Sequence, residues 1–178
     1  VQVVLGFPAK GYHGQLADSL KQLVESIDGI STAKIDVTSK IAAHKVQKGV
    51  KHIENIKNII AVASGKGGVG KSTTAVNLAL ALRARGAEVG LLDADIYGPS
   101  QQVMLGIPDD QRPEQQGGQF LLPVEAHGLK TMSMGYLVND RTPMVWRGPM
   151  AGGALAQMLE QTLWGELDYL VIDMPPGT

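Results

Sequence analysis

The sequence predicts an α/β fold in which a mostly parallel sheet is flanked by helices. Apolar runs of strand length occur at 59–63, 89–92 and 168–173, and segments of helical periodicity lie between them. A Gly-rich turn at 65–70 separates the first run from the helix that follows it. Strand–helix alternation of this kind implies parallel strands joined by right-handed crossovers.

The composition excludes several classes of protein. The 178 residues are 44% hydrophobic and 19% charged, with a net charge of −1, which is normal for a globular core and excludes a disordered chain. No apolar run reaches the roughly 18 residues of a membrane-spanning helix, and no overall basic charge favours nucleic acid. The chain has no Cys, which excludes a disulfide scaffold or a thiolate metal site within these residues.

Residues 1–38 have the pattern of a small, partial α/β domain. Its predicted elements are a strand, a helix and a second strand, and the second strand covers residues 30 to 38. The helix carries an apolar stripe and ends at Asp28-Gly29. The stripe consists of Leu16, Leu20, Leu23, Val24 and Ile27. A docking role and a purely structural role both fit this unit.

Residues 39–58 form a basic segment with one acidic residue, Glu54. Its basic residues are Lys40, His44, Lys45, Lys48, Lys51, His52 and Lys57. Such a segment can contact nucleic acid or an acidic partner, but Lys is usually solvated, so we expect a linker. The two histidines have no nearby ligand partner, and we predict no metal site here.

Residues 59–178 form the N-terminal portion of the main domain. The first apolar run, 59–63, is typical of a strand buried on both faces. A helix is expected from Lys71 to about Arg85, ended by Gly86. The next predicted elements are a strand at 89–92 and a loop-rich segment at 97–123, which has a short helix near 101–105. A helix at 150–163 and a strand at 168–173 complete the pattern.

The segment from Gly65 to Ser72 satisfies the phosphate-loop pattern G-x-x-x-x-G-K-[ST]. Its glycines let backbone N–H groups approach phosphate oxygens, Lys71 can reach the β- and γ-phosphates, and the Ser72 hydroxyl can bind Mg²⁺. The helix that begins at Lys71 adds its positive N-terminal end. We therefore expect ATP to bind Gly65, Lys66, Gly67, Gly68, Val69, Gly70, Lys71, Ser72 and Thr73.

Lys66 is a second lysine that the general pattern does not require. It matches the deviant loop K-G-G-x-G-K-[ST] of dimeric ATPases, in which this lysine reaches the nucleotide of the partner subunit. A cation supplied in this way would neutralise charge that develops on the transferred phosphoryl group. Lys66 is therefore a candidate catalytic residue, and a solvated loop lysine is the alternative.

Three aspartates lie at the carboxyl ends of predicted parallel strands, where ligands collect in open α/β sheets. Asp173 has the position of a Walker B acid that binds Mg²⁺ directly or through water. Asp95 is the candidate to orient the attacking water and also to contact Mg²⁺. Asp93 is either a further Mg²⁺ contact or a hydrogen-bonded strand end.

Four segments resemble the Mrp/ApbC family of iron–sulfur cluster carrier ATPases. They are 64–72 (SGKGGVGKS), 92–100 (LDADIYGPS), 144–150 (MVWRGPM) and 168–178 (DYLVIDMPPGT). Together they span residues 64–178 at spacings similar to those of the family. The resemblance extends to the N-terminal unit, of which we expect only the later part to be present.

The resemblance implies a cytoplasmic homodimeric ATPase that holds a [4Fe-4S] cluster and passes it to apoproteins. It implies that Lys66 is the signature lysine, that Gly67 to Thr73 bind ATP, and that Ser72 binds Mg²⁺. Asp95 and Asp173 then belong to the first and second switch. The cluster ligands of the family are a C-x-x-C pair beyond the second switch, so we expect them outside these residues and interpret the chain as a fragment.

The alternative function is a ParA/MinD-type organiser, in which the same loop gates a dimer on DNA or on a membrane. The segments at 95–100 and 146–150 favour the carrier instead, and we therefore expect neither a nucleic-acid nor a membrane partner. A metabolic ligase on the same fold is a third reading, for which no substrate motif is present.

Overall fold

The computed structural model describes residues 1–44, 53–96, 98–136 and 148–177, with the backbone alone for 148–151. Several predictions concern residues outside these ranges. They include the basic residues Lys45, Lys48, Lys51 and His52, the segment at 144–147, Tyr97 and Thr178.

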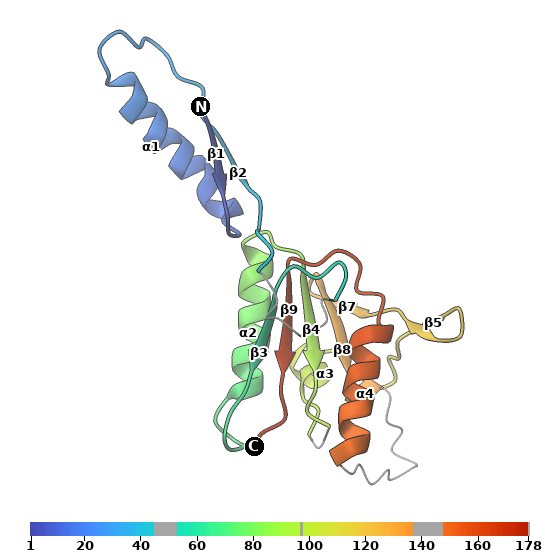
Figure 1. Cartoon of the computed structure of the whole chain (residues 1–178). Coiled ribbons are helices and arrows are strands. Elements are labelled where there is room, and N and C mark those ends of the chain that lie inside the picture. The colour runs from blue at the N-terminus through green and yellow to red at the C-terminus, as the bar shows by residue number, and fades with distance from the viewer. Residues whose placement is uncertain (45–52, 97, 137–147, 178) are drawn as a thin grey trace.

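A five-stranded sheet forms the centre of the main domain (Figure 1). Its order is β3-β9-β4-β8-β7, and every pair is parallel except β7 with β8. The strands are β3 (Ile59–Val62), β4 (Val89–Asp93), β7 (Val124–Ala126), β8 (Leu129–Ser133) and β9 (Tyr169–Asp173). The predicted α/β fold with a mostly parallel sheet is thereby confirmed.

Three helices accompany this sheet among the described residues: α2 (Lys71–Ala84), α3 (Gln101–Met104) and α4 (Gly148–Gln161). A short hairpin of β5 (Gln115–Gln116) and β6 (Phe120–Leu121) lies in the segment predicted to be loop-rich. A 3-10 turn, η2 (Met134–Tyr136), follows β8. Within the described ranges, no helix is long and apolar enough to cross a membrane.

The core lies where α2 packs on the middle of the sheet. All five residues of β4 are buried, as expected for a central parallel strand. Ala75 and Ala79 of α2 are fully buried, and their small side chains let the helix approach the strands closely. Gly90 of β4 allows a different close contact, with Leu167 and Leu170, because an added Cβ would lie 2.7 Å from the first and 2.9 Å from the second.

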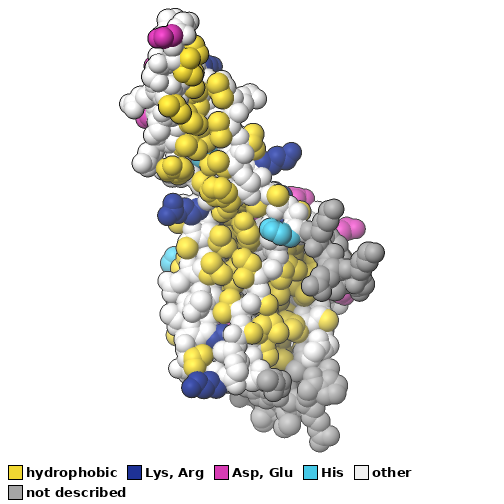
Figure 2. All heavy atoms as spheres, turned by 60° about the vertical axis from the view of Figure 1, so that its left-hand side comes forward, with side chains coloured by type: hydrophobic (Ala, Val, Ile, Leu, Met, Phe, Trp, Pro, Cys, Tyr) yellow, Lys and Arg dark blue, Asp and Glu magenta, His cyan; other side chains and the backbone are white. Residues whose placement is uncertain are grey.

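The prediction that the first apolar run is buried on both faces is wrong. β3 is the edge strand of the described sheet, and the side chain of Ile59 is 48% exposed. Figure 2 shows apolar side chains gathered in a band that runs from the N-terminal unit onto this side of the main domain. Burial of a strand depends on neighbours from elsewhere in the chain, which a local apolar run does not reveal.

The N-terminal unit contains the predicted strand, helix and strand and extends away from the main domain (Figure 1). Its elements are β1 (Gln2–Leu5), the 3-10 turn η1 (Lys10–Tyr12), α1 (His13–Glu25) and β2 (Asp36–Ser39), with β1 parallel to β2. One expectation fails, because the second strand covers only 36–39 instead of 30–38. Of the apolar stripe, Leu23 is 64% exposed, and Ile27, which lies beyond the end of α1, is 55% exposed.

The described part of the basic segment makes contacts within the chain. The Lys57 Nζ lies 2.7 Å from Asp168 Oδ1, and His44 Nδ1 lies 2.6 Å from Asn58 Oδ1. At the junction of the two units, the Lys10 N–H donates to the Arg85 carbonyl at 3.0 Å. The division into units at residues 38 and 58 stays a prediction.

Candidate functional site

The glycine loop at 65–70 follows β3 and leads directly into α2. Gly68 and Gly70 have φ values of 73° and 84°, a conformation that residues with a Cβ rarely adopt. A Cβ added at Gly65 or Gly67 would meet no atom within 4 Å, so the space beside the loop is open. Among the described residues no side chain caps the N-terminus of α2, and its N–H groups are therefore available to an anion.

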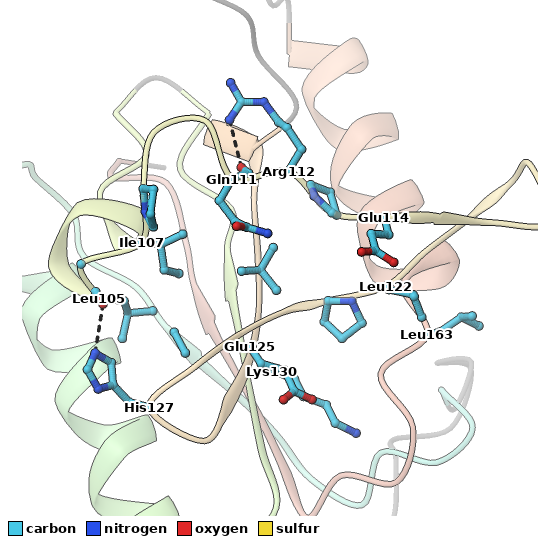
Figure 3. A pocket seen from close by; sticks show the side chains of 16 residues that line it. Leu105, Ile107, Gln111, Arg112, Glu114, Leu122, Glu125, His127, Lys130 and Leu163 are labelled. Carbon is cyan, nitrogen blue, oxygen red and sulfur yellow. Dashed lines mark hydrogen bonds between the residues drawn. The ribbon is translucent and has the colours of Figure 1, made fainter.

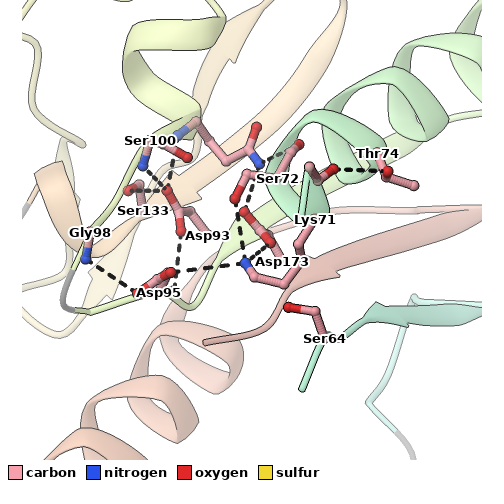
Figure 4. Close-up of polar contacts among 12 residues, drawn as sticks. Ser64, Lys71, Ser72, Thr74, Asp93, Asp95, Gly98, Ser100, Ser133 and Asp173 are labelled. Atoms are coloured by element: carbon pink, nitrogen blue, oxygen red, sulfur yellow. Dashed lines mark hydrogen bonds and ion pairs between the residues drawn. The ribbon is translucent and has the colours of Figure 1, made fainter. Parts of the chain in front are cut away.

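Lys71 lies among three oxygen-bearing side chains at the end of this loop (Figure 4). Its Nζ donates to Asp173 Oδ1, lies 3.4 Å from Ser72 Oγ and lies 3.9 Å from Asp95 Oδ2. The Lys71 side chain is 7% exposed and that of Asp173 is fully buried. The ends of β4 and β9 supply the two carboxylates, which the parallel pairing of these strands brings to one edge of the sheet.

The same oxygen groups fit Mg²⁺, which binds one or two carboxylates together with the phosphates of its nucleotide. A positive charge, the Lys71 ammonium, already lies among Ser72, Asp95 and Asp173. The described residues contain no cluster of three or more His, Asp or Glu arranged to hold a metal by themselves. The donor set therefore suits a metal that arrives with a nucleotide.

Asp93 is a hydrogen-bonded strand end, which is one of its two predicted roles, and the Mg²⁺ contact stays a prediction. Its Oδ1 accepts the N–H of Asp95 at 3.1 Å, and its Oδ2 accepts those of Ser100 and Gln101 at 2.9 and 3.0 Å. Burial raises the pKa of this carboxyl, the three backbone hydrogen bonds oppose the rise, and the charge of Asp173 adds to it. Asp93 thus fixes the turn after β4 and the start of α3.

Asp95 is buried in the site, whereas Lys66 is exposed. Asp95 is 8% exposed, and its Oδ1 accepts the Gly98 N–H at 3.2 Å. The side chain of Lys66 is exposed and has no hydrogen bond or ion pair to the described residues, whereas its carbonyl accepts a bond from Ser64 Oγ at 3.0 Å. Thr73 is also exposed, on the first turn of α2. The catalytic and binding roles of these residues stay predictions.

Sequence reasoning did not find Gln101, which belongs to the same network. Its Nε2 donates to Asp173 Oδ2 at 2.8 Å and to the Ser72 carbonyl at 3.1 Å. Ser133 Oγ, also not anticipated, lies 3.4 Å from Asp93 Oδ2. Nothing in the sequence distinguishes Gln101 from the adjacent Gln102, since both lie in the segment predicted as a short helix.

A separate cavity of 630 Å³ lies between the segment after α3 and strand β7 (Figure 3). None of the predicted site residues lines it. Its basic side chains bind backbone carbonyls: Arg112 binds those of Asp109 and Gln111, His127 that of Leu105, and Lys130 that of Trp164. These groups are engaged in local structure, and we assign the cavity no role in the chemistry.

Comparison with known proteins gives a match to a protein family over residues 55–178. The matching family model is described as ParA, the NUBPL iron-transfer P-loop NTPases. An "iron-sulfur cluster carrier protein" of Pseudomonas fragi is 59% identical over 159 residues, which are 89% of this chain and 55% of the relative. A protein of the same name from Escherichia coli K12 is 53% identical over 178 residues, which are 100% of this chain and 48% of the relative.

A relative from Dictyostelium discoideum, named "iron-sulfur cluster transfer protein NUBPL", is 54% identical over 71% of this chain and 39% of its own. Among solved structures, a nucleotide-binding protein from Archaeoglobus fulgidus in complex with ADP matches with a TM-score of 0.60 and 38% identity. That match covers 70% of this chain and 47% of the solved one. The chain thus spans about half the length of the curated relatives it matches.

Proposed function

The chain belongs to the family of NUBPL iron-transfer P-loop NTPases, and we propose that it is the nucleotide-binding part of an ATP-hydrolysing iron–sulfur cluster carrier. The observation that carries the ATPase proposal is the placement of Lys71 at the end of an open glycine loop, among Ser72, Asp95 and Asp173. The names of its relatives support the carrier proposal.

In this proposal the nucleotide enters the open loop, where the N–H groups of 65–70 and the first turn of α2 bind its phosphates. Lys71 leaves Asp173 and binds the β- and γ-phosphates. Ser72, Asp95 and Asp173 would hold Mg²⁺, which when bound neutralises charge on the phosphate oxygens. Asp95, whose Oδ2 lies 3.9 Å from Lys71 Nζ, orients the attacking water.

Lys66 completes the site from a second subunit. Its exposed side chain, without a bond to the described residues, supports a role toward a molecule outside this chain. A homodimer that places Lys66 against the partner's nucleotide would neutralise charge on the transferred phosphoryl group. The proposed enzyme is therefore a Mg²⁺-dependent ATPase that is complete only as a dimer.

Two substitutions separate the roles of the lysines. Lys71→Ala removes the cation that binds the phosphates, and we expect nucleotide binding to be lost. Lys66→Ala removes only a contact made across the dimer, so binding stays and hydrolysis is suppressed, by about 10³-fold if Lys66 acts like an arginine finger. Calorimetric titration with ADP and measurement of phosphate release test both. Equal loss of binding in the two variants would contradict the role of Lys66.

The carrier function belongs to the full-length protein. An iron–sulfur cluster needs soft thiolate ligands, and the 178 residues contain no Cys, so the cluster ligands lie outside them in this proposal. Anaerobic reconstitution of the full-length protein should give an iron–sulfur absorption band, and incubation with an apoprotein should transfer the cluster. Failure of reconstitution with intact thiols would refute the carrier role while leaving the ATPase role standing.

No observation favours the alternative of a ParA/MinD-type organiser. Each of the three curated relatives described above is named as an iron–sulfur cluster carrier or transfer protein. We propose apoproteins as the partners and the cytoplasm as the location.

A further inference from the structure

We propose that Gln101 is a positioning residue for the magnesium site, holding Asp173 in place when Lys71 turns to the phosphates. This inference rests on the proposed ATPase function. It starts from the two oxygens of Asp173, which have different partners: Lys71 at Oδ1 and the Gln101 amide at Oδ2. The Asp173 side chain is fully buried, so both bonds are formed away from water.

The orientation of the Gln101 amide follows from its contacts. The nitrogen faces two acceptors, Asp173 Oδ2 and the carbonyl of Ser72, and an oxygen in that place would have no proton to accept. The nitrogen therefore bridges the end of β9 and the first turn of α2. The two elements that supply the predicted ligands Asp173 and Ser72 are thus joined by one side chain.

The oxygen of the same amide is in an unfavourable environment. Gln101 is 1% exposed, and its Oε1 has no hydrogen-bond partner among the described residues. Buried amide oxygens are rarely left without a donor, and each case calls for an explanation. The explanation here is that the two hydrogen bonds of the amide nitrogen, both made at the proposed magnesium site, fix the orientation of the amide and leave its oxygen without a donor.

The backbone of Gln101 fixes where this side chain begins. Its N–H donates to Asp93 Oδ2 at 3.0 Å, so the strand end of β4 anchors the first residue of α3. When Lys71 leaves to bind phosphate, the described residues retain one side-chain donor to Asp173, the Gln101 amide. Oδ2 then stays held while Oδ1 is free for the metal or for a water on it.

Gln102 provides a matched control. It is also a buried glutamine of α3, 8% exposed, but its Nε2 donates to the Pro108 carbonyl at 2.7 Å, away from the site. Gln101→Met and Gln101→Glu remove the donor while keeping the length of the side chain. Gln102→Met and Gln102→Glu make the same changes to the neighbour.

The experiment measures metal binding apart from activity, on the full-length protein. Mn²⁺ titration of the protein–ADP complex, followed by electron paramagnetic resonance, reports the affinity of the metal site, and calorimetry with ADP in EDTA reports nucleotide affinity without metal. Loss of a residue that orients a metal ligand typically weakens metal binding 10- to 100-fold. We expect a loss of about this size in both Gln101 variants, with metal-free ADP affinity within about twofold of wild type.

Hydrolysis gives a second readout. The Mg²⁺ concentration for half-maximal rate should rise in the Gln101 variants by a similar factor, with a smaller change in kcat. Both Gln102 variants should match the wild type in every measurement. If a Gln101→Glu variant fails to fold, Gln101→Met carries the test.

Two results would overturn the assignment. One is wild-type Mn²⁺ affinity in folded Gln101→Met protein, and the other is an equal loss in the Gln102 variants. Either result, with normal ADP binding by the wild type, would leave the proposed ATPase function standing. Absence of ADP binding by the wild type would instead overturn the proposed function and this assignment together.

Discussion

Lys71 has two sets of partners that it cannot satisfy at once. Its ammonium is paired with buried Asp173, whereas the phosphate-loop motif requires the same ammonium at the nucleotide. Removing one member of a buried ion pair is costly unless another charge takes its place. Nucleotide and Mg²⁺ together meet this requirement, because the phosphates accept the lysine and the metal compensates the carboxylate. The contacts of Lys71 thus favour joint binding of metal and nucleotide.

Tyr136 shows a second buried polar pair, outside the chemistry. Its hydroxyl lies 2.8 Å from Thr131 Oγ1, which itself donates to the Val124 carbonyl, so the tyrosine is the donor of the pair. Burial raises the pKa of Tyr136 above its ordinary value of about 10, and the negative charge of Asp93 adds to the rise. The folded protein therefore holds this proton at a pH where the unfolded chain releases it.

The sign of the pH effect follows from that difference. The stability that the phenol contributes is fully present below about pH 10 and is lost as the pH rises through the raised pKa. We expect Tyr136→Phe to lower the free energy of unfolding by about 1 kcal/mol at pH 8, the typical contribution of one hydrogen bond. The gap between wild type and variant should shrink above pH 10. Urea unfolding at pH 8 to 11 measures it, and a gap that widens with pH would contradict the assignment.

At the scale of elements, the sequence predicts best what neighbouring residues determine. The phosphate loop, the start of α2 and the strand ends at Asp93 and Asp173 follow from contiguous motifs, and they lie where predicted. A glycine loop between a strand and a helix needs no distant partner to be recognised. The predicted α/β class follows likewise from the alternation of apolar runs and helical periodicity.

The errors arise where the outcome depends on distant elements. β3 has the apolar composition of a central strand but lies at the edge of the described sheet. Gln101 could not be predicted, because its partners are 29 and 72 residues away and meet it only in the folded chain. Contacts between elements that are distant in the sequence, which a local pattern does not specify, separate these cases from the correct ones.

For the whole molecule, the site and the N-terminal unit lie at opposite ends of α2. The phosphate loop precedes the first residue of this helix, whereas Lys10 of the N-terminal unit bonds to Arg85 just after its last. The site residues come from the loop and from the ends of β4 and β9, with α3 beside them. Stabilisation by a nucleotide should therefore be concentrated at one end of the molecule.

Nucleotide binding should raise the melting temperature and protect only that end from hydrogen exchange. At a free concentration 100 times its Kd, a ligand stabilises the folded state by about 2.7 kcal/mol, which corresponds to about 5–11 °C for a domain of this size. Calorimetry with and without Mg²⁺–ADP gives the shift, and hydrogen exchange locates it. Amides of 64–72, 93–104 and 170–177 should gain protection, whereas those of β1, α1 and β2 should not. Lys71→Ala, the control, should show neither effect. Equal protection of α1 would contradict this localisation and would mean that the bond between Lys10 and Arg85 couples the two units to the nucleotide.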